Sequence, residues 1–282
     1  MRIEAISVIW RWDGTMGEME KDIVTVKIYP KEQGSIDLGI SSVIGTRSSQ
    51  EDTVFGEAEG AEAIAVVCDG MGGLSGGELA SKAAVQCLVE DWFSEEEITD
   101  IPQFLEKEAK KADEMVFCQT DASGERIQSG TTIAAVIIRD NALYWLSVGD
   151  SKIYLIRGDE ITAACREHNY RLTLDQQLKE GSITPEEYAA EEYRAEALIS
   201  YLGMGSLSLM DINRQPFCLE DGDIVLLSSD GLYKSLSEED ILRIVREQGT
   251  SMQTAANALT AAALGNKTKG QDNTSVVVMR YS

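Results

Sequence analysis

The chain has 282 residues but a single histidine, His168. Zinc sites are usually rich in histidine, and Ser-His-Asp and Cys-His nucleophilic sites need one as a base. The scarcity therefore excludes a His-rich zinc site and weakens any proposal of a catalytic triad. Any catalysis by this chain must rest mainly on carboxylates and metal ions.

Paired cysteine motifs and long apolar runs are also missing. The five cysteines are odd in number and widely spread, without a Cys-x-x-Cys motif, which favours reduced, mostly buried thiols in a cytosolic protein. No apolar run approaches the roughly 20 residues that cross a bilayer. The N-terminal residues do not resemble a secretory signal, because charged residues are scattered among the apolar ones. We therefore expect a cytoplasmic protein without a membrane contact.

Basic residues are scarce relative to acidic ones. Lysine and arginine number 25 against 48 aspartates and glutamates, a formal net charge of −23. A nucleic acid would be repelled, and no basic stripe opposes that repulsion. The acidic surplus is either a solvated, aggregation-resistant surface or partly a set of ligands for bound cations.

The pattern of the remaining residues predicts one large α+β domain. Consecutive β-branched segments with short turns indicate antiparallel pairing, and two successive helices between strands suit a layer over one face of a sheet. The expected strands span 35–44, 63–68, 131–138, 142–148, 152–157, 224–229 and 274–281, and the expected helices span 78–93, 101–120, 237–246 and 252–264.

Two segments fall outside this regular pattern. Residues 1–34 form an N-terminal extension, which we interpret as an added strand on a sheet edge, with a docking segment as the alternative. Residues 167–205 are polar and helical, and Thr184-Pro185-Glu186-Glu187 is typical of a helix start. This second segment is either a flap over a substrate site or a structural helical hairpin. The catalytic domain would then span 35–282.

Acidic residues recur where apolar strands end. Three strands end beside a glycine-containing turn, at Asp69-Gly70, Gly149-Asp150 and Asp230-Gly231, while Asp272 precedes a strand and Glu51-Asp52 follow one. An Asp-Gly pair is also the commonest turn dipeptide, so one such pair alone would be weak evidence. Strand ends converge at one edge of a sandwich, where several carboxylates would repel one another unless cations neutralised them. The pattern predicts a site for Mg²⁺ or Mn²⁺, with two ions favoured over one.

Arg47 lies four residues before Glu51 in the same polar loop. By itself this loop reads best as a surface loop with a salt bridge. Beside a two-ion site, however, a guanidinium could bind phosphate oxygens through two hydrogen bonds. The chemistry that fits is hydrolysis of a phosphomonoester by a metal-activated water, without a covalent intermediate.

Six motifs in order resemble those of the metal-dependent protein phosphatase family, also called the protein phosphatase 2C family. The similarity covers roughly residues 36–282, and the bacterial serine/threonine phosphatase branch is the closer match because it uses Asp-Gly-Met-Gly-Gly. The motifs are Arg47-x-x-x-Glu51-Asp52, Asp69-Gly70-Met71-Gly72-Gly73, Ser129-Gly130-Thr131-Thr132, Val148-Gly149-Asp150-Ser151, Ser229-Asp230-Gly231-Leu232 and Asp272-Asn273-Thr274-Ser275.

The resemblance implies a four-layer αββα fold, a central sandwich of two antiparallel sheets flanked by helices. It also implies a role for each site residue. Asp69 would bridge two ions, and the Gly70 carbonyl would bind one of them. Asp230 and Asp272 would complete the shell of one ion. Glu51 would hold the other mostly through water, with Asp52 orienting nearby waters. Arg47 would bind the substrate phosphate, and Asp150 would hold a third, weaker ion.

Three positions depart from the family pattern. Met71 stands where animal relatives carry a histidine thought to act as general acid, so a metal-bound water would protonate the leaving oxygen. Lys234 stands four residues after Asp230, where many relatives carry another acid for the third metal, and it puts occupancy of that site in doubt. Gln176 replaces a common histidine in the 167–205 segment, so substrate preference would differ.

The sequence therefore predicts a cytoplasmic, monomeric, metal-dependent phosphatase. Its substrates would be phosphoserine and phosphothreonine on proteins, placed there by a cognate serine/threonine kinase, and its cofactors would be two Mn²⁺ or Mg²⁺ ions. The alternative is a catalytically silent pseudophosphatase that acts as a partner-binding module. A missing metal ligand would favour that alternative, and no core ligand position is missing.

Overall fold

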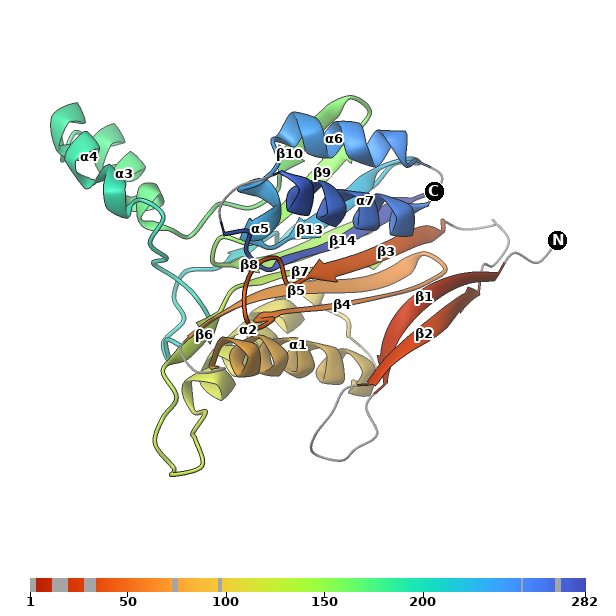
Figure 1. The fold of residues 1–282 in the computed structure, drawn as a ribbon, viewed down its shortest axis with the longest axis horizontal. Helices are drawn as coiled ribbons and strands as arrows, with labels where there is room; N and C mark the ends of the chain where they lie inside the picture. Colours follow the sequence, from red (N-terminus) through yellow and green to blue (C-terminus); the bar gives the residue numbers. More distant parts are fainter. Residues whose placement is uncertain are drawn as a thin grey trace.

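A computed structural model describes residues 4–11, 20–27, 34–72, 76–95, 98–249, 251–266 and 270–282. Two large antiparallel sheets pack face to face, and helices cover the outer face of each (Figure 1). This arrangement confirms the predicted four-layer αββα architecture. Among the described residues, no helix is long and apolar enough to span a membrane.

The first sheet has the strand order β10-β9-β13-β14-β3, and every neighbouring pair is antiparallel. The second sheet has the order β11-β8-β7-β5-β4, with β6 paired to the end of β5 and β12 paired to β8. The strands of the first sheet are β3 (Ile36–Val43), β9 (Lys152–Arg157), β10 (Glu160–Ala163), β13 (Ile224–Ser228) and β14 (Thr274–Tyr281). Those of the second are β4 (Asp52–Glu59), β5 (Glu62–Gly72), β6 (Ser129–Thr131), β7 (Ile133–Arg139), β8 (Ala142–Val148), β11 (Asp211–Ile212) and β12 (Phe217–Cys218).

The central strand β5 is buried on both faces, which explains its unbroken apolar sequence. Side chains alternate across a strand, so Ala65 and Val67 face the other sheet in one core while Ile64 and Val66 face the helices in another. The sandwich core joins β5 and β7 to β9, β13 and β14. This double burial holds the ends of these strands in fixed positions.

Two helices cover the second sheet and three cover the first. Helices α1 (Gly76–Ser94) and α2 (Ile101–Phe117) pack on the second sheet, as two successive helices were expected to do. Helices α5 (Asp230–Tyr233), α6 (Glu238–Glu247) and α7 (Met252–Gly265) pack on the first. Asp100 caps α2 by accepting a hydrogen bond from the Gln103 amide at 2.9 Å.

The segment 167–205 carries α3 (Tyr170–Lys179), α4 (Pro185–Glu191) and a 3₁₀ turn (Glu192–Arg194). The predicted start of α4 is confirmed, because Thr184 and Glu187 form a reciprocal capping box. In Figure 1 these helices stand away from the two sheets. In the N-terminal extension, β1 (Glu4–Arg11) and β2 (Glu20–Lys27) pair with each other in a ribbon of their own. Neither strand pairs with a large sheet among the described residues, and the role of the extension, as an added edge strand or as a docking segment, stays a prediction.

Three local expectations need correction. The strand expected to end at Cys68 continues to Gly72, because β6 and β4 supply hydrogen-bonding partners for its last residues. The segment after Asp52 forms a strand that the alternation did not reveal. The cysteines are all free, but Cys118 and Cys218 are exposed rather than buried.

Candidate metal and phosphate site

The acidic side chains predicted at strand ends are brought together by the pairing of β4 with β5. Asp52 begins β4 and lies directly opposite Asp69 in the antiparallel register. Directly opposed residues project from the same face of a sheet, so the two carboxylates are neighbours. Asp52 is 6% exposed, and such burial of an acid needs a partner or a counter-charge.

Hydrogen bonds across the sandwich connect this pair to the first sheet. The Ser229 hydroxyl donates to Oδ2 of Asp52 at 2.7 Å, and the Ser275 amide donates to the Ser229 hydroxyl at 3.0 Å. Ser229 immediately precedes Asp230, the first residue of α5. The end of β13 therefore brings Asp230 to the edge of the sandwich where Asp52 and Asp69 lie.

The loop that carries Arg47 and Glu51 is held against the Asp272 loop. The Glu51 amide donates to Oδ1 of Asn273 at 2.7 Å, and the Asn273 side chain donates to the carbonyls of Ile44 and Ser49. Glu51 is also fixed to β5, because its carbonyl accepts the Gly70 amide at 3.1 Å. Asn273 thus positions Glu51 beside the strand end that bears Asp272.

Gly70 makes this approach possible. A Cβ at this position would lie 2.1 Å from the Gly77 carbonyl oxygen and 2.5 Å from that of Glu51. Only glycine leaves that space free. The strand end, the start of α1 and the Glu51 loop can therefore meet at one point.

Asp150 reaches the same edge through Thr132. The Thr132 hydroxyl accepts the Asp69 amide at 3.0 Å and bonds the Ser151 hydroxyl at 2.7 Å. Gly149 takes a φ of 98°, and a Cβ there would lie 2.6 Å from Cγ2 of Thr132. Both constraints require glycine before Asp150.

The electrostatics of these acids show that they act on one another. Burial raises the pKa of Asp69 well above its usual range, and the charges of Asp52, Asp230, Asp150 and Asp272 raise it further. Burial also raises the pKa of Asp52 to about 7, against the lowering effect of hydrogen bonds from serine hydroxyls. The pKa of Asp150 is raised to about 6, first by burial and then by Asp230. We name Glu51, Asp52, Asp69, Asp150, Asp230 and Asp272 the strand-end cluster.

The strand-end cluster fits divalent cations. Oδ1 of Asp52 and Oδ1 of Asp230 are buried without a hydrogen-bond partner among the described residues. Such orphaned oxygens are costly unless a ligand occupies them. Carboxylate and carbonyl oxygens are the ligands that Mg²⁺ and Mn²⁺ prefer. The negative charge, the orphaned oxygens and the type of donor atom therefore all favour a site for divalent cations.

In the part of the chain that the structure describes, two basic side chains contact the strand-end cluster. The Arg47 guanidinium donates to Oδ2 of Asp272 at 2.5 Å and is itself largely exposed. The Lys234 ammonium donates to Oδ2 of Asp230 at 2.6 Å. A guanidinium has five N–H donors, so Arg47 can bind Asp272 and still offer donors to an incoming anion.

The single histidine lies outside this set. His168 is fully buried, accepts the Gly149 amide on Nδ1 at 3.2 Å, and faces Asp211 with Nε2 at 3.4 Å. Met71 pairs with Gly130 where β5 meets β6. Gly73, the last residue of the motif that contains Met71, lies outside the described residues. No imidazole is therefore available to the site as a general acid.

Sequence reasoning missed the residues that position the acids. Thr132, Ser229 and Asn273 each connect two acid-bearing segments through hydrogen bonds. All three stand inside the six family-like motifs, and Ser229 and Asn273 are directly next to an acid. For those two residues, a hydroxyl or amide side chain beside an acid was the available signal.

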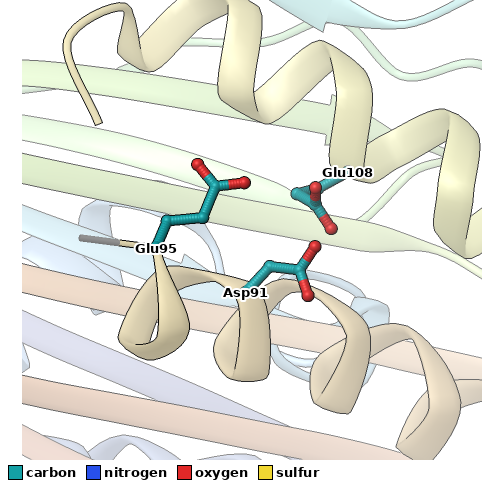
Figure 2. Close-up of side chains that lie close together, drawn as sticks. All are labelled: Asp91, Glu95 and Glu108. Atoms are coloured by element: carbon teal, nitrogen blue, oxygen red, sulfur yellow. The ribbon is translucent and has the colours of Figure 1, made fainter. Parts of the chain in front are cut away.

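A second group of acids was not predicted at all. Asp91 and Glu95, at the end of α1, and Glu108 of α2 point toward one another, with one oxygen of each within 4.8 Å of the others (Figure 2). We name them the helical cluster. Two lysines already offset most of its charge, since Lys107 lies 2.6 Å from Glu95 and Lys111 lies 2.7 Å from Asp91. Geometry alone therefore does not identify it as a metal site.

The family model for protein phosphatase 2C matches residues 41–265. The protein phosphatase PhpP of Streptococcus pneumoniae is 30% identical over 221 residues, which cover 76% of this chain and 84% of PhpP. The serine/threonine protein phosphatase PstP of Mycobacterium tuberculosis is 30% identical over 235 residues, 82% of this chain. That alignment spans only 42% of PstP.

Solved structures agree with this match. The S. agalactiae serine/threonine phosphatase has a TM-score of 0.73 at 26% identity, over 87% of this chain and 99% of the other. The catalytic domain of PstP in complex with two manganese ions has a TM-score of 0.69 at 28% identity, over 88% and 99%.

The fold of this chain is therefore that of the solved bacterial serine/threonine phosphatase structures. The chain belongs to the protein phosphatase 2C family.

Proposed function

We propose that this protein hydrolyses phosphoserine and phosphothreonine monoesters on proteins with the help of two divalent ions. The observation that carries the proposal is the convergence of the strand-end cluster beside Arg47. The relatives named serine/threonine phosphatases, and the two manganese ions of the PstP catalytic domain, support it.

The site residues take three kinds of role: holding ions, orienting water and binding phosphate. We assign Asp69 and the Gly70 carbonyl, with Asp230 and Asp272, to holding the ions. Glu51 would hold an ion mostly through water, and Asp52 would orient nearby waters. Arg47 binds phosphate oxygens. When bound, the ions supply Lewis acidity and lower the pKa of a water nucleophile.

The oxygen donors of the strand-end cluster do not distinguish Mn²⁺ from Mg²⁺. Carboxylates suit both Mn²⁺ and Mg²⁺, and we propose that either supports the reaction. The family resemblance implies a third, weaker ion at Asp150, and the contact of the Lys234 ammonium with Asp230 bears on whether that ion binds. The burial of Asp150, at 7% exposed, and its raised pKa support a demand for positive charge there.

The 167–205 segment is proposed as a flap over this site because both of its ends bond to site strands. At one end the His168 amide donates to the Gly149 carbonyl at 2.8 Å. At the other, Leu202 and Thr131 exchange hydrogen bonds at 2.8 and 3.0 Å. The segment therefore starts beside Asp150 and ends beside the strand that contacts Asp69.

The substrates we propose are proteins phosphorylated by a cognate serine/threonine kinase, and the protein would act as a monomer in the cytoplasm. Five free cysteines support a reducing compartment. The formal charge of −23 opposes nucleic acid as a partner.

The test is phosphate release from a phosphothreonine peptide and from an aryl phosphate. With Mn²⁺ or Mg²⁺ we expect release, and with a chelator we expect none. Arg47→Ala should raise KM for the peptide more than it lowers kcat, because Arg47 contacts phosphate. Absence of release with either metal, in protein whose circular dichroism is that of a folded domain, would reject the proposal.

A further inference from the structure

Lys234 follows Asp230 by one helical turn at the edge of the strand-end cluster. Asp230 begins α5 and Lys234 caps its C-terminus, so their side chains share one face of the helix. The Lys234 ammonium lies 2.6 Å from Oδ2 of Asp230. The other oxygen of Asp230 is buried without a hydrogen-bond partner among the described residues.

The same ammonium acts on Asp150, which comes from a different strand end. Burial and the Asp230 charge raise the pKa of Asp150, and the Lys234 charge lowers it. The neighbouring Lys152 is engaged elsewhere, because its ammonium lies 2.7 Å from Glu167 and 4.1 Å from the centre of the Tyr233 ring. Among the described residues, Lys234 is therefore the lysine that contacts Asp230 directly and whose charge also acts on Asp150.

A count of formal charges shows what this ammonium replaces. The six acids of the strand-end cluster carry six negative charges, and Arg47 and Lys234 carry two positive ones. Two divalent ions would balance the remaining four. A third divalent ion beside Asp150 and Asp230 would leave an excess of positive charge and would meet the ammonium at close range.

We propose that Lys234 is a built-in cation of this site, which takes the place of a third divalent ion beside Asp150 and Asp230 and limits the site to two ions. The inference rests on the proposed function, since it concerns the ions of that same site. The two proposals can be tested separately, because the number of bound ions is measured without measuring phosphate release.

The experiment counts Mn²⁺ per chain by equilibrium dialysis followed by metal analysis, at Mn²⁺ concentrations up to the millimolar range. The wild-type chain should bind two ions. Lys234→Asp should bind a third, and adding Asp150→Asn to it should remove that third ion. Lys234→Met, which removes the charge but keeps much of the side-chain length, should also gain a third ion, about tenfold more weakly than Lys234→Asp.

Lys110→Asp is the matched control. Lys110 also lies one helical turn after an acid, 2.7 Å from Glu106, but on α2. This variant should keep two ions. Circular dichroism checks the fold of each variant, and Lys234→Met serves where Lys234→Asp does not fold.

Three ions on the wild-type chain, or two on both folded Lys234 variants, would overturn the inference. Phosphate release is measured in parallel on the wild type. Release with three ions bound would reject this inference alone. Two bound ions without release would reject the proposed function and leave the ion count standing.

Discussion

Acidic side chains gather in two places in this protein, and the two clusters differ in what neutralises them. The helical cluster has its oxygens within 4.8 Å of one another (Figure 2). Burial raises the pKa of Glu108 there, but Lys107 and Lys111 oppose the rise. In the strand-end cluster burial and mutual repulsion dominate, and the pKa of Asp69 is raised well above its usual range.

The difference teaches that proximity alone does not mark a metal site. Within the helical cluster each carboxylate lies within 4 Å of a lysine ammonium, as the ion pairs at 2.6, 2.7 and 3.3 Å show. The strand-end cluster instead has six acids against Arg47 and Lys234, with orphaned oxygens on Asp52 and Asp230 among the described residues. Oε1 of Glu108 in the helical cluster also lacks a hydrogen-bond partner, but the Lys107 ammonium lies 3.3 Å from it. Uncompensated charge, together with unsatisfied oxygen atoms, is the stronger indicator.

The largest expected effect is on the reaction rate. Asp69→Asn should lower phosphate release from a phosphopeptide by at least about a thousandfold, because it removes a charged ligand that would contact both ions. Asp91→Asn, the matched change in the helical cluster, should stay within about twofold. Steady-state kinetics at saturating Mn²⁺ measure both. Loss of less than tenfold in Asp69→Asn would contradict the assignment.

The next effect is on stability in the presence of metal. Each occupied site should add about 2.7 kcal/mol to the free energy of unfolding when Mn²⁺ is present at 100 times its Kd. Glu95→Gln should keep this stabilisation, and Asp230→Asn should lose much of it. Thermal unfolding with and without Mn²⁺ reports the shift. If Glu95→Gln abolished it, the helical cluster would be the metal site.

A smaller effect is the pH dependence of the metal-free protein. Raised pKa values, about 7 for Asp52 and about 6 for Asp150, mean that the folded chain binds more protons than the unfolded chain between about pH 4 and 7. The free energy of unfolding should therefore fall as pH rises through that window. The slope is at most about 1.4 kcal/mol per pH unit for each extra proton.

In the helical cluster, the pKa of Asp91 is lowered, first by its hydrogen bond with Lys111. Its contribution is present above the unfolded pKa and is lost as pH falls below about 4. Asp52→Asn should flatten the pH dependence of the free energy of unfolding between pH 4 and 7. Asp91→Asn should leave that pH dependence unchanged. Urea unfolding at a series of pH values, in chelator, measures this. An unchanged slope in Asp52→Asn would show that the buried Asp52 carboxyl is not the source of the pH dependence.

The smallest effect tests the lysines of the helical cluster. Lys111→Met should destabilise the protein by about 1 kcal/mol, below the range for a fully buried pair because the lysine is partly exposed. Lys110→Met, on the same helix, removes an exposed pair and should cost less than about 0.5 kcal/mol. Urea unfolding compares the two. Equal costs would show that burial of Glu108 adds nothing.

Much of the fold could be predicted from the sequence because most strands are apolar, β-branched runs bounded by turns. The double burial of β5 requires an unbroken apolar run, and Asp69 comes directly after it. The strand β4 was missed, since its exposed glutamates and central Gly56 weaken the alternation. The length of β5 was underestimated because β6, its partner beyond Asp69, lies some 60 residues later in the chain.

The candidate site was also only partly predictable from the sequence. The identity of the acids followed from their position after apolar segments. The hydrogen bonds from Thr132, Ser229 and Asn273 did not, because each connects residues distant in sequence. The sequence did not predict the pairing of Lys234 with Asp230 either. The four-residue spacing was visible, but the helix that permits the pairing starts at Asp230 itself.

By itself, the sequence determined which residue types stand where the apolar runs stop, because a strand buried on both faces needs an unbroken apolar run and a carboxylate interrupts that run. Only the tertiary structure decided which of these acids share counter-charges. The docking of α2 on α1 brings Lys111 of α2 to Asp91 of α1, whereas the packing of two sheets brings five aspartates and a glutamate to one edge with few cations. Electrostatic energy depends on distances across the folded chain, and no local pattern encodes them.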